Sequence, residues 1–512
     1  MLDDRSGHSR APIALAGAAA LHALVLATAS FLPFVDLPQH VAAAQLVLHR
    51  RDPALAATYE FALFPAVNVL GLFVMVPLHA VLPEAAAVRV LMALYFAGLA
   101  WALVRLGRAA GGSPWSAVLA MVFALNYNLV YGFVSFCLGI PILVLLVSRL
   151  ADGLGVRARG STRALVVDAL LWWSLALAHV LLFGFALLVL GAWLAMARRA
   201  PRIPRVMAML PGLSWVIGCG LLMRPSLARG SPGTVEFLWH DASARAAEFG
   251  RAFGVASDSG AVEWAGLSVV AFTTLLARAG ERRPWDGDPI MVTPRRFVRV
   301  AGGLGAVLFV ALPFSIYDSR HGSHGLFLLY ARFLVFLPLL WLPALRAPAR
   351  VLAPIACALH LGLTIHWTAM LRSVGRQARG LDGAIAALAP YGRVKSLVYE
   401  PVPAGMRFEG FLHVASLHQA RAHGETDQSF ALIPSNPVRY ADPHRPYLSR
   451  DDEHMFPERF DWLRSRSYDA LLIYDPHDAA RAQWSAATGR LVFESNGWRV
   501  VAMQTDASLR SR

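Results

Sequence analysis

Apolar runs of roughly membrane-spanning length recur along the first 370 residues, separated by short polar stretches. A helix needs about 20 apolar residues to cross the hydrocarbon core of a bilayer, and backbone groups in lipid must bond within their own segment. The pattern predicts a polytopic α-helical membrane protein of about 11–13 spans over residues 1–371, with the run at 164–196 long enough for two short helices. The predicted spans are 12–34, 63–82, 86–106, 115–131, 132–150, 164–196, 205–223, 263–279, 299–316, 326–346 and 349–370.

Arginine gathers in the short loops between these runs and predicts their orientation, since such loops stay in the cytoplasm. With them inside, 224–262, 317–325 and everything after about residue 371 lie outside, as does the first external loop, 35–62. One conflict arises: splitting 164–196 near His179 repairs the loop at 149–163 but changes the parity upstream. The arginines concerned are Arg105, Arg108, Arg149, Arg157, Arg159, Arg163, Arg198, Arg199, Arg202, Arg205, Arg278, Arg282, Arg283, Arg295, Arg296, Arg299, Arg346 and Arg350.

The character of the chain changes after Met370, where Pro, Gly, His and charged residues reach the density of a soluble protein. We predict that residues 372–512 form an extracytoplasmic α/β domain, large enough to hold its own core. Asn496-Gly497 is a favoured two-residue turn between β-prone runs. The predicted elements are strands at 394–399 and 470–474, a hairpin at 491–504, and helices at 378–388 and 456–465.

Composition narrows the class of protein. Charged residues make up 16% of the 512 residues and the mean hydropathy is +0.49, whereas soluble proteins carry about 25% charged residues. The net charge of +14 lies in short loops, as expected for a membrane protein, so no nucleic-acid partner is predicted. Three widely spaced cysteines suggest neither a disulfide framework nor a zinc site. The sequence has no G-x-S-x-G, Walker or GxGxxG motif, which leaves hydrolase, ATPase and dinucleotide-binding readings without support.

The end of the first apolar run carries a single carboxylate. Asp36 opens the stretch Asp-Leu-Pro-Gln-His, so that His40 follows it by four residues and Pro38 begins a short helix. One interpretation is a general base with a helper, facing a pocket at the membrane surface. The alternative is helix capping, because Asp before a proline in the first turn is also good N-cap chemistry.

This arrangement resembles the GT-C superfamily of membrane glycosyltransferases. The resemblance rests on a cytoplasmic N-terminus, a first span that ends in Asp36, an interfacial segment, many further spans and a C-terminal α/β domain. It implies a polyprenyl-phosphate-linked sugar donor and a catalytic carboxylate in the first external loop, here Asp36. Many members of the superfamily show an acidic pair, whereas this chain has Asp36 alone, with Asp52 and Glu60 as distant candidates.

A second polar stretch precedes the span at 326–346. Arg332 lies early in that span, where a charge usually faces the protein interior and a polar ligand. The resemblance implies that Arg332 binds the donor phosphate, because a guanidinium group can form bidentate hydrogen bonds with phosphate oxygens. The alternative is that its side chain snorkels to the membrane interface. The loop before it offers Arg320 and His321 as further phosphate-binding candidates, and His324 with His40 as acceptor or support residues.

Other histidines and loops carry weaker signals. His321 and His324 have the i, i+3 spacing of metal ligands but no placed carboxylate, so no metal site is predicted. His413, His418, His423 and His444 fit no metal motif either, and His179 within an apolar run is typical of a hydrogen-bonded packing residue. The loop at 224–262 has the size of an acceptor-shaping loop, although its balanced charge also fits a solvated surface.

The sequence as a whole predicts an inverting membrane glycosyltransferase of a bacterial inner membrane, with its C-terminal domain in the periplasm. Asp36 would deprotonate a glycan, lipid or protein acceptor, and Arg332 would offset the charge of the departing lipid phosphate. No soluble cofactor is required, and the sequence leaves open whether a divalent metal takes part. Two alternatives remain: a transporter or flippase of lipid-linked glycans, and a non-catalytic scaffold of the same fold.

Overall fold

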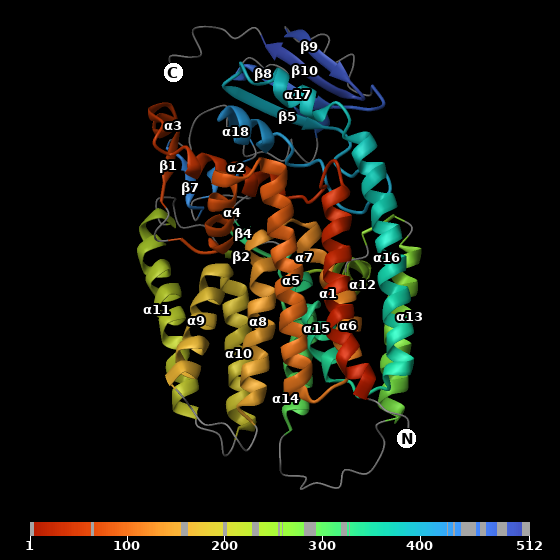
Figure 1. The fold of residues 1–512 in the computed structure, drawn as a ribbon. Helices are drawn as coiled ribbons and strands as arrows, with labels where there is room; N and C mark the ends of the chain where they lie inside the picture. Colours follow the sequence, from red (N-terminus) through yellow and green to blue (C-terminus); the bar gives the residue numbers. More distant parts are fainter. Residues whose placement is uncertain are drawn as a thin grey trace.

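The computed structural model describes residues 5–503 apart from 63–65, 155–161, 198–201, 228–234, 254–255, 259, 281–292, 319–324, 327, 428, 434–435, 442–456, 461–466 and 479–488. Helices run roughly side by side through most of the molecule, and a five-stranded sheet covers one end of them (Figure 1). This arrangement confirms the predicted class, a polytopic α-helical membrane protein with a C-terminal α/β domain.

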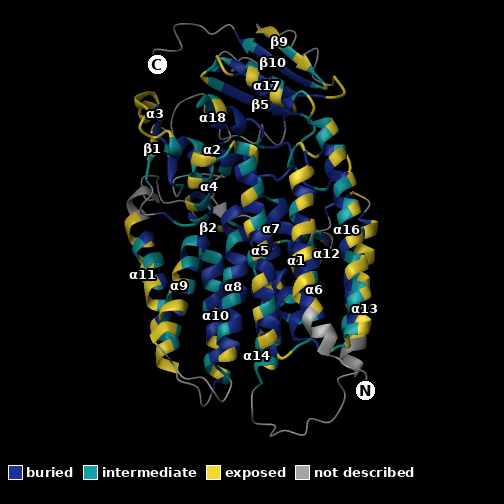
Figure 2. Cartoon of the chain, in the orientation of Figure 1, coloured by how far each residue is buried: buried dark blue, intermediate teal, exposed yellow. Residues whose placement is uncertain are grey.

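Within the residues that the structure describes, five helices are long and apolar enough to cross a membrane by length and composition. The outer faces of α11, α13 and α16 expose apolar side chains, whereas α8 is largely buried (Figure 2). Apolar side chains on an outer helix face match a lipid surface. The five helices are α1 (Arg5–Thr28), α5 (Glu84–Ala110), α8 (Val134–Asp152), α11 (Arg202–Leu227) and α16 (Ala349–Gln377).

The predicted span at 63–82 is wrong. Its helix, α4 (Leu70–Val81), has only 12 residues and is too short to cross. Asn68 has a φ of 61°, and its side-chain oxygen accepts a bond of 3.2 Å from the backbone N–H of Val180, so the chain turns before α4 begins. Gln45 in α2 (Leu37–Leu48) contacts His79 of α4 at 3.0 Å, which ties α4 to the segment that follows Asp36.

The run at 164–196 divides into two helices, α9 (Thr162–Ala178) and α10 (Val180–Met196). His179 separates them in extended conformation and caps α10, with its Nδ1 accepting the backbone N–H of Leu181 at 3.1 Å. One crossing is therefore gained here and one lost at α4. This exchange removes the parity conflict, because every arginine-rich loop can now lie on one side of the membrane.

Ion pairs and hydrogen bonds connect the arginine-bearing helix ends. Asp168 in α9 is buried and pairs with both Arg149 of α8 and Arg205 of α11. The carbonyl of Gly111, after α5, accepts bonds from Arg295 at 3.2 Å and Arg346 at 3.1 Å. These ends lie away from the five-stranded sheet (Figure 1). An outside location for the sheet stays a prediction from the positive-inside rule.

Two of the remaining predicted spans are irregular. The run at 115–131 is buried along almost its whole length, and the helical segments at 326–346 are also mostly buried, so protein rather than lipid surrounds their broken backbone. The first contains α6 (Pro114–Ala120), η1 (Met121–Ala124) and α7 (Tyr127–Val130); the second contains η2 (Tyr330–Phe333), α15 (Phe336–Trp341) and η3 (Leu342–Ala344). Two further helices correspond to the predicted spans at 263–279 and 299–316: α13 (Ala261–Gly280) and α14 (Pro294–Ala311).

The C-terminal sheet has the order β6-β5-β8-β10-β9. β5 pairs in parallel with β6 and β8, while β8, β10 and β9 pair antiparallel. The predicted strands and the hairpin through Asn496-Gly497 are confirmed, and α17 (Leu381–Ala387) falls within the predicted helix; part of the helix predicted at 456–465 lies outside the described residues. The strands are β5 (Arg393–Val398), β6 (Glu425–Thr426), β8 (Ala470–Tyr474), β9 (Gly489–Ser495) and β10 (Trp498–Met503).

Two small sheets join the two predicted external loops to distant parts of the chain. β1 (Tyr59–Phe61), in the first external loop, pairs antiparallel with β7 (Val438–Tyr440) of the C-terminal domain. β2 (Val235–Leu238), in the 224–262 loop, pairs with β3 (Ser315–Asp318), which also pairs with β4 (Gly325–Leu326). Both external loops are thus fixed by backbone hydrogen bonds.

Candidate functional site

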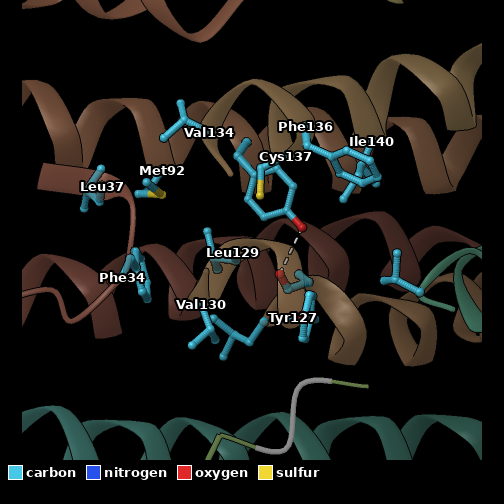
Figure 3. Packing of buried hydrophobic residues seen from close by; sticks show 14 of the residues in the cluster. Phe34, Leu37, Met92, Tyr127, Leu129, Val130, Val134, Phe136, Cys137 and Ile140 are labelled. Atoms are coloured by element: carbon cyan, nitrogen blue, oxygen red, sulfur yellow. Dashed lines mark hydrogen bonds between the residues drawn. The ribbon is translucent and has the colours of Figure 1, made fainter. Parts of the chain in front are cut away.

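The backbone around Asp36 is anchored on the turn that follows α7. The N–H of Asp36 donates to the carbonyl of Tyr131 at 2.9 Å, and the N–H of Val35 donates to the carbonyl of Val130 at 3.1 Å. On either side, Phe34 and Leu37 are buried in the core that contains Leu129 and Val130 (Figure 3). The position of Asp36 is therefore set by its neighbours rather than by its own side chain.

The capping interpretation of Asp36 is wrong. Asp36 occupies the N-cap position of α2, but its side chain makes no cap hydrogen bond and its φ and ψ of −92° and −5° are helical. The carboxylate instead faces the C-terminal domain, with Oδ1 at 3.4 Å from Nε2 of His413. Its side chain is 16% exposed, which leaves it enclosed but reachable.

Gly132 permits this close packing. Its φ is 72°, a left-handed value, and a Cβ at this position would lie 2.6 Å from the N of Leu37 and 3.0 Å from the N of Asp36. Only glycine has no side chain to place there. The turn at residues 131–133 therefore packs directly against the Asp36 backbone.

Arg332 contacts the same turn. It belongs to η2, and its guanidinium carbon stacks 3.7 Å from the ring centroid of Phe133. Its Nη1 lies 3.3 Å from Nε2 of His179, and its carbonyl accepts a bond of 3.3 Å from Asn128. The guanidinium faces protein groups at the start of α8 and α10, so the snorkelling interpretation is wrong.

The environment of Asp36 shifts the pKa of its carboxyl group toward neutral pH. Burial raises the pKa of Asp36 to about 7, although the positive charge of Arg332 acts in the opposite direction. A carboxyl group with a pKa near the working pH is both available as a base and able to hold a proton. The pair thus combines a near-neutral base with a fixed cation, contributed by two segments far apart in the sequence.

His40 does not pair with Asp36 through its ring. The ring lies edge-on to Phe430 of the C-terminal domain, with centroids 5.2 Å apart. Burial lowers the pKa of His40 to about 4, so the ring is neutral. Its observed contact is with the C-terminal domain, and the predicted support role stays a prediction.

The distant carboxylate candidates are engaged elsewhere. Asp52 caps α3 (Pro53–Thr58) by accepting the N–H of Ala54 at 2.9 Å. Glu60 lies in β1 and pairs with Arg439 at 3.3 Å. Arg320, His321 and His324 lie outside the described residues. Within the described part of the chain, no group of three or more His, Cys, Asp or Glu side chains is arranged to hold a metal ion.

Two further carboxylates act on the same turn. The charges of Glu409 and Glu248 both act on the hydroxyl of Tyr131. Glu248 belongs to α12 (Ala242–Ala252) in the 224–262 loop, and Glu409 belongs to the C-terminal domain. The 224–262 loop and the C-terminal domain therefore both approach the turn beside Asp36.

Sequence reasoning missed His413 and the partners of Arg332. His413 stood out only as one of several histidines whose spacing fits no motif, and Phe133 carried no signal. The sequence predicts a packing role for His179, yet this residue lies beside the arginine that the resemblance assigns to the donor phosphate. Each of these contacts joins segments that no local pattern connects.

Neither the family models nor the curated proteins include a match to this chain. Among solved structures, ArnT from Cupriavidus metallidurans superposes on it in two crystal structures, one in the apo state and one bound to undecaprenyl phosphate. The TM-scores are 0.56 and 0.55, and the superpositions cover 97% of this chain and 98% of ArnT at 13% sequence identity. ArnT is a GT-C glycosyltransferase. The chain has the GT-C fold. The predicted resemblance is thereby confirmed at the level of the fold, over almost the entire length.

Proposed function

We propose that this protein is an inverting membrane glycosyltransferase that moves a sugar from a polyprenyl-phosphate donor to an acceptor outside the cytoplasm. The observation that carries the proposal is the convergence of Asp36 and Arg332 on one turn, 131–133, in a chain with the GT-C fold. The undecaprenyl phosphate bound to ArnT supports a polyprenyl carrier for the donor.

The neighbourhood of Arg332 has the chemistry of a phosphate site. Nδ1 of His179 accepts the N–H of Leu181, so an uncharged ring carries its proton on Nε2. That N–H and Nη1 of Arg332 are both donors, and they lie 3.3 Å apart. A phosphate oxygen is an acceptor that two such donors can share, and a guanidinium makes short, charge-assisted bonds to it.

The reaction follows from these positions. The acceptor hydroxyl oxygen attacks the anomeric carbon and forms the new C–O bond, while Asp36 takes the hydroxyl proton. The bond between the anomeric carbon and the phosphate oxygen breaks, and the electron pair leaves with the lipid phosphate. Arg332 and the Nε2–H of His179 offset the charge that develops on that phosphate. Attack opposite the leaving group inverts the anomeric centre.

Turnover of the purified protein with a panel of radiolabelled polyprenyl-phosphate sugars tests this proposal. Asp36→Asn removes the base while keeping the size of the side chain, and we expect release of sugar to fall by roughly 10²–10⁴-fold. Asp52→Asn is the matched control, because asparagine caps a helix as well as aspartate does, and it should turn over as the wild type does. Equal release from the wild type and Asp36→Asn would overturn the mechanism and favour the transporter or scaffold.

A second pair of variants separates donor binding from proton transfer. Arg332→Gln removes the cation, so we expect the KM for the lipid-linked sugar to rise and kcat to fall, together by roughly 10- to 100-fold in kcat/KM. Arg350, exposed at the start of α16, provides the control Arg350→Gln. Unchanged donor kinetics in Arg332→Gln would remove Arg332 from the donor site.

A further inference from the structure

The carboxylate of Asp36 meets a residue from the opposite end of the chain. Nε2 of His413 lies 3.4 Å from Oδ1 of Asp36, and the two side chains are 14% and 16% exposed. The Asp36 side chain makes no cap hydrogen bond to α2, and its carboxylate faces the histidine instead. The C-terminal domain thus reaches the atom that the proposed mechanism uses as a base.

The segment that carries His413 is fixed on the stretch before Asp36. A Cβ on Gly410 would lie 2.7 Å from the Cβ of Pro33, so the two backbones are in close contact. The rings of Phe411 and Phe31 pack with centroids 5.6 Å apart. His413 is therefore held by packing rather than by its contact with Asp36.

A second anchor holds the same segment from the 224–262 loop. The N–H of Arg407 donates to the carbonyl of Ala256 at 2.9 Å, and the N–H of Gly405 donates to Oδ2 of Asp258 at 3.0 Å. Ser257 forms an isolated antiparallel bridge with Met406. The stretch before Asp36 and the 224–262 loop thus hold the His413 segment in place.

We propose that His413 is a positioning residue that donates its Nε2–H to Oδ1 of Asp36 and thereby directs the other carboxylate oxygen toward the acceptor hydroxyl. This rests on the proposed function, in which Asp36 is the base. A carboxylate with one oxygen engaged presents the second in a defined direction, which favours a near-attack arrangement of the acceptor. His413 supplies a donor to the carboxylate in a chain that has no second acidic residue next to Asp36 in the first external loop.

The hydrogen bond also predicts a change in titration. Among the described residues, the charged or titratable groups that act on the Asp36 carboxylate are Arg332 from η2 and His413. His40, on α2 itself, has its ring turned to Phe430. A donor to the charged form of a carboxyl group lowers its pKa. Loss of His413 should therefore raise the pKa of Asp36 further and move the acid limb of the pH profile to higher pH.

Steady-state kinetics against pH, with the lipid-linked sugar that the wild type turns over, test the proposal. In His413→Ala we expect kcat to fall by roughly 10- to 100-fold with the donor KM unchanged. His413→Gln places an amide N–H near the lost Nε2–H and should restore most of kcat. His477→Ala is the control, since His477 is 76% exposed and pairs with Glu400. Wild-type kcat in His413→Ala, or no rescue in His413→Gln, overturns the proposal.

A readout without substrate separates this proposal from the proposed function. The infrared band of the protonated Asp36 carboxyl, identified by its loss in Asp36→Asn, is titrated in wild type, His413→Ala and His413→Gln. A midpoint that rises in His413→Ala and returns in His413→Gln supports the hydrogen bond even if no donor sugar is turned over. An unchanged midpoint overturns it even if Asp36-dependent turnover is found.

Discussion

At the scale of single residues, the base of the candidate site weakens the fold that holds it. The folded pKa of Asp36 is about 7, raised by burial, whereas an unfolded aspartate titrates near 3.9. Between these values the native state binds more protons than the unfolded state, so this group's contribution to stability falls as pH rises through about 4 to 7. The destabilisation is complete above pH 7.

Asp36→Asn should therefore be more stable than the wild type at pH 8 and lose this advantage near pH 4. We expect a gain of ~1–3 kcal/mol at pH 8, less than the roughly 4 kcal/mol of the full shift because the group is partly exposed. Thermal unfolding in detergent at the two pH values measures it, with Asp52→Asn as the surface control. A gain that does not depend on pH would contradict the raised pKa.

Gly132 gives a second prediction at this scale. Gly132→Ala puts a methyl group where the N of Leu37 lies 2.6 Å away and forces an alanine to a φ of 72°. Turnover should fall at least tenfold, because a small displacement of Asp36 is costly to positioned chemistry, and stability should fall by about 1–3 kcal/mol. Gly303→Ala is the matched control, as a Cβ there meets nothing within 4 Å. Equal turnover in the two variants would show that Gly132 does not set the position of Asp36.

At the scale of elements, the helix α12 holds the segment that carries Arg332. Arg245 of α12 donates to the carbonyls of Phe309 and Leu312 at 2.6 and 2.8 Å, which satisfies the carboxyl end of α14. Its guanidinium also stacks 4.6 Å from the ring of Tyr330 in η2. One side chain thus connects the 224–262 loop, α14 and η2.

Arg245→Met keeps much of the stem and removes the donors, so two carbonyls lose charge-assisted partners. We expect a stability loss of about 2 kcal/mol and a rise of severalfold in donor KM, because η2 positions Arg332. Unfolding midpoints and donor kinetics measure both effects, with Arg350→Met as the control. A stability loss without any change in donor KM would limit Arg245 to a structural role.

The element scale also shows how far sequence patterns reach. The length of the apolar runs predicted the long helices, and the Asn496-Gly497 turn predicted the hairpin, because both signals are local in the sequence. Run length could not tell α4 from a span, since the turn at Asn68 depends on a bond to the start of α10. The carboxylate at the end of the first span pointed to Asp36, whereas His413 and Phe133 approach the site only through tertiary packing.

At the scale of the whole molecule, the C-terminal domain and the first external loop share a buried polar network. The hydroxyl of Tyr59 donates to the carbonyl of Gly424 at 2.6 Å and accepts Nε2 of Gln419 at 2.7 Å. Ser429 donates to Oε1 of Gln419 at 2.8 Å. Because these groups are buried between the loop and the domain, their bonds fix the docking that brings His413 to Asp36.

Breaking this network should weaken the docking of the C-terminal domain on the first external loop, and the effects of substitutions at Tyr59 and Gln419 should be coupled. Tyr59→Phe removes the donor to the buried carbonyl of Gly424 and the acceptor for the buried amide of Gln419, for a cost of about 1–3 kcal/mol. Gln419→Leu should cost a similar amount. Both changes disturb one network, so the double variant should lose less than the sum of the single losses, with a coupling of about 0.5–3 kcal/mol. Unfolding in detergent measures the cycle, and the infrared midpoint of Asp36 should rise in both single variants as His413 moves away. Strict additivity, with an unchanged midpoint, would mean that the domain docks on the site through other contacts.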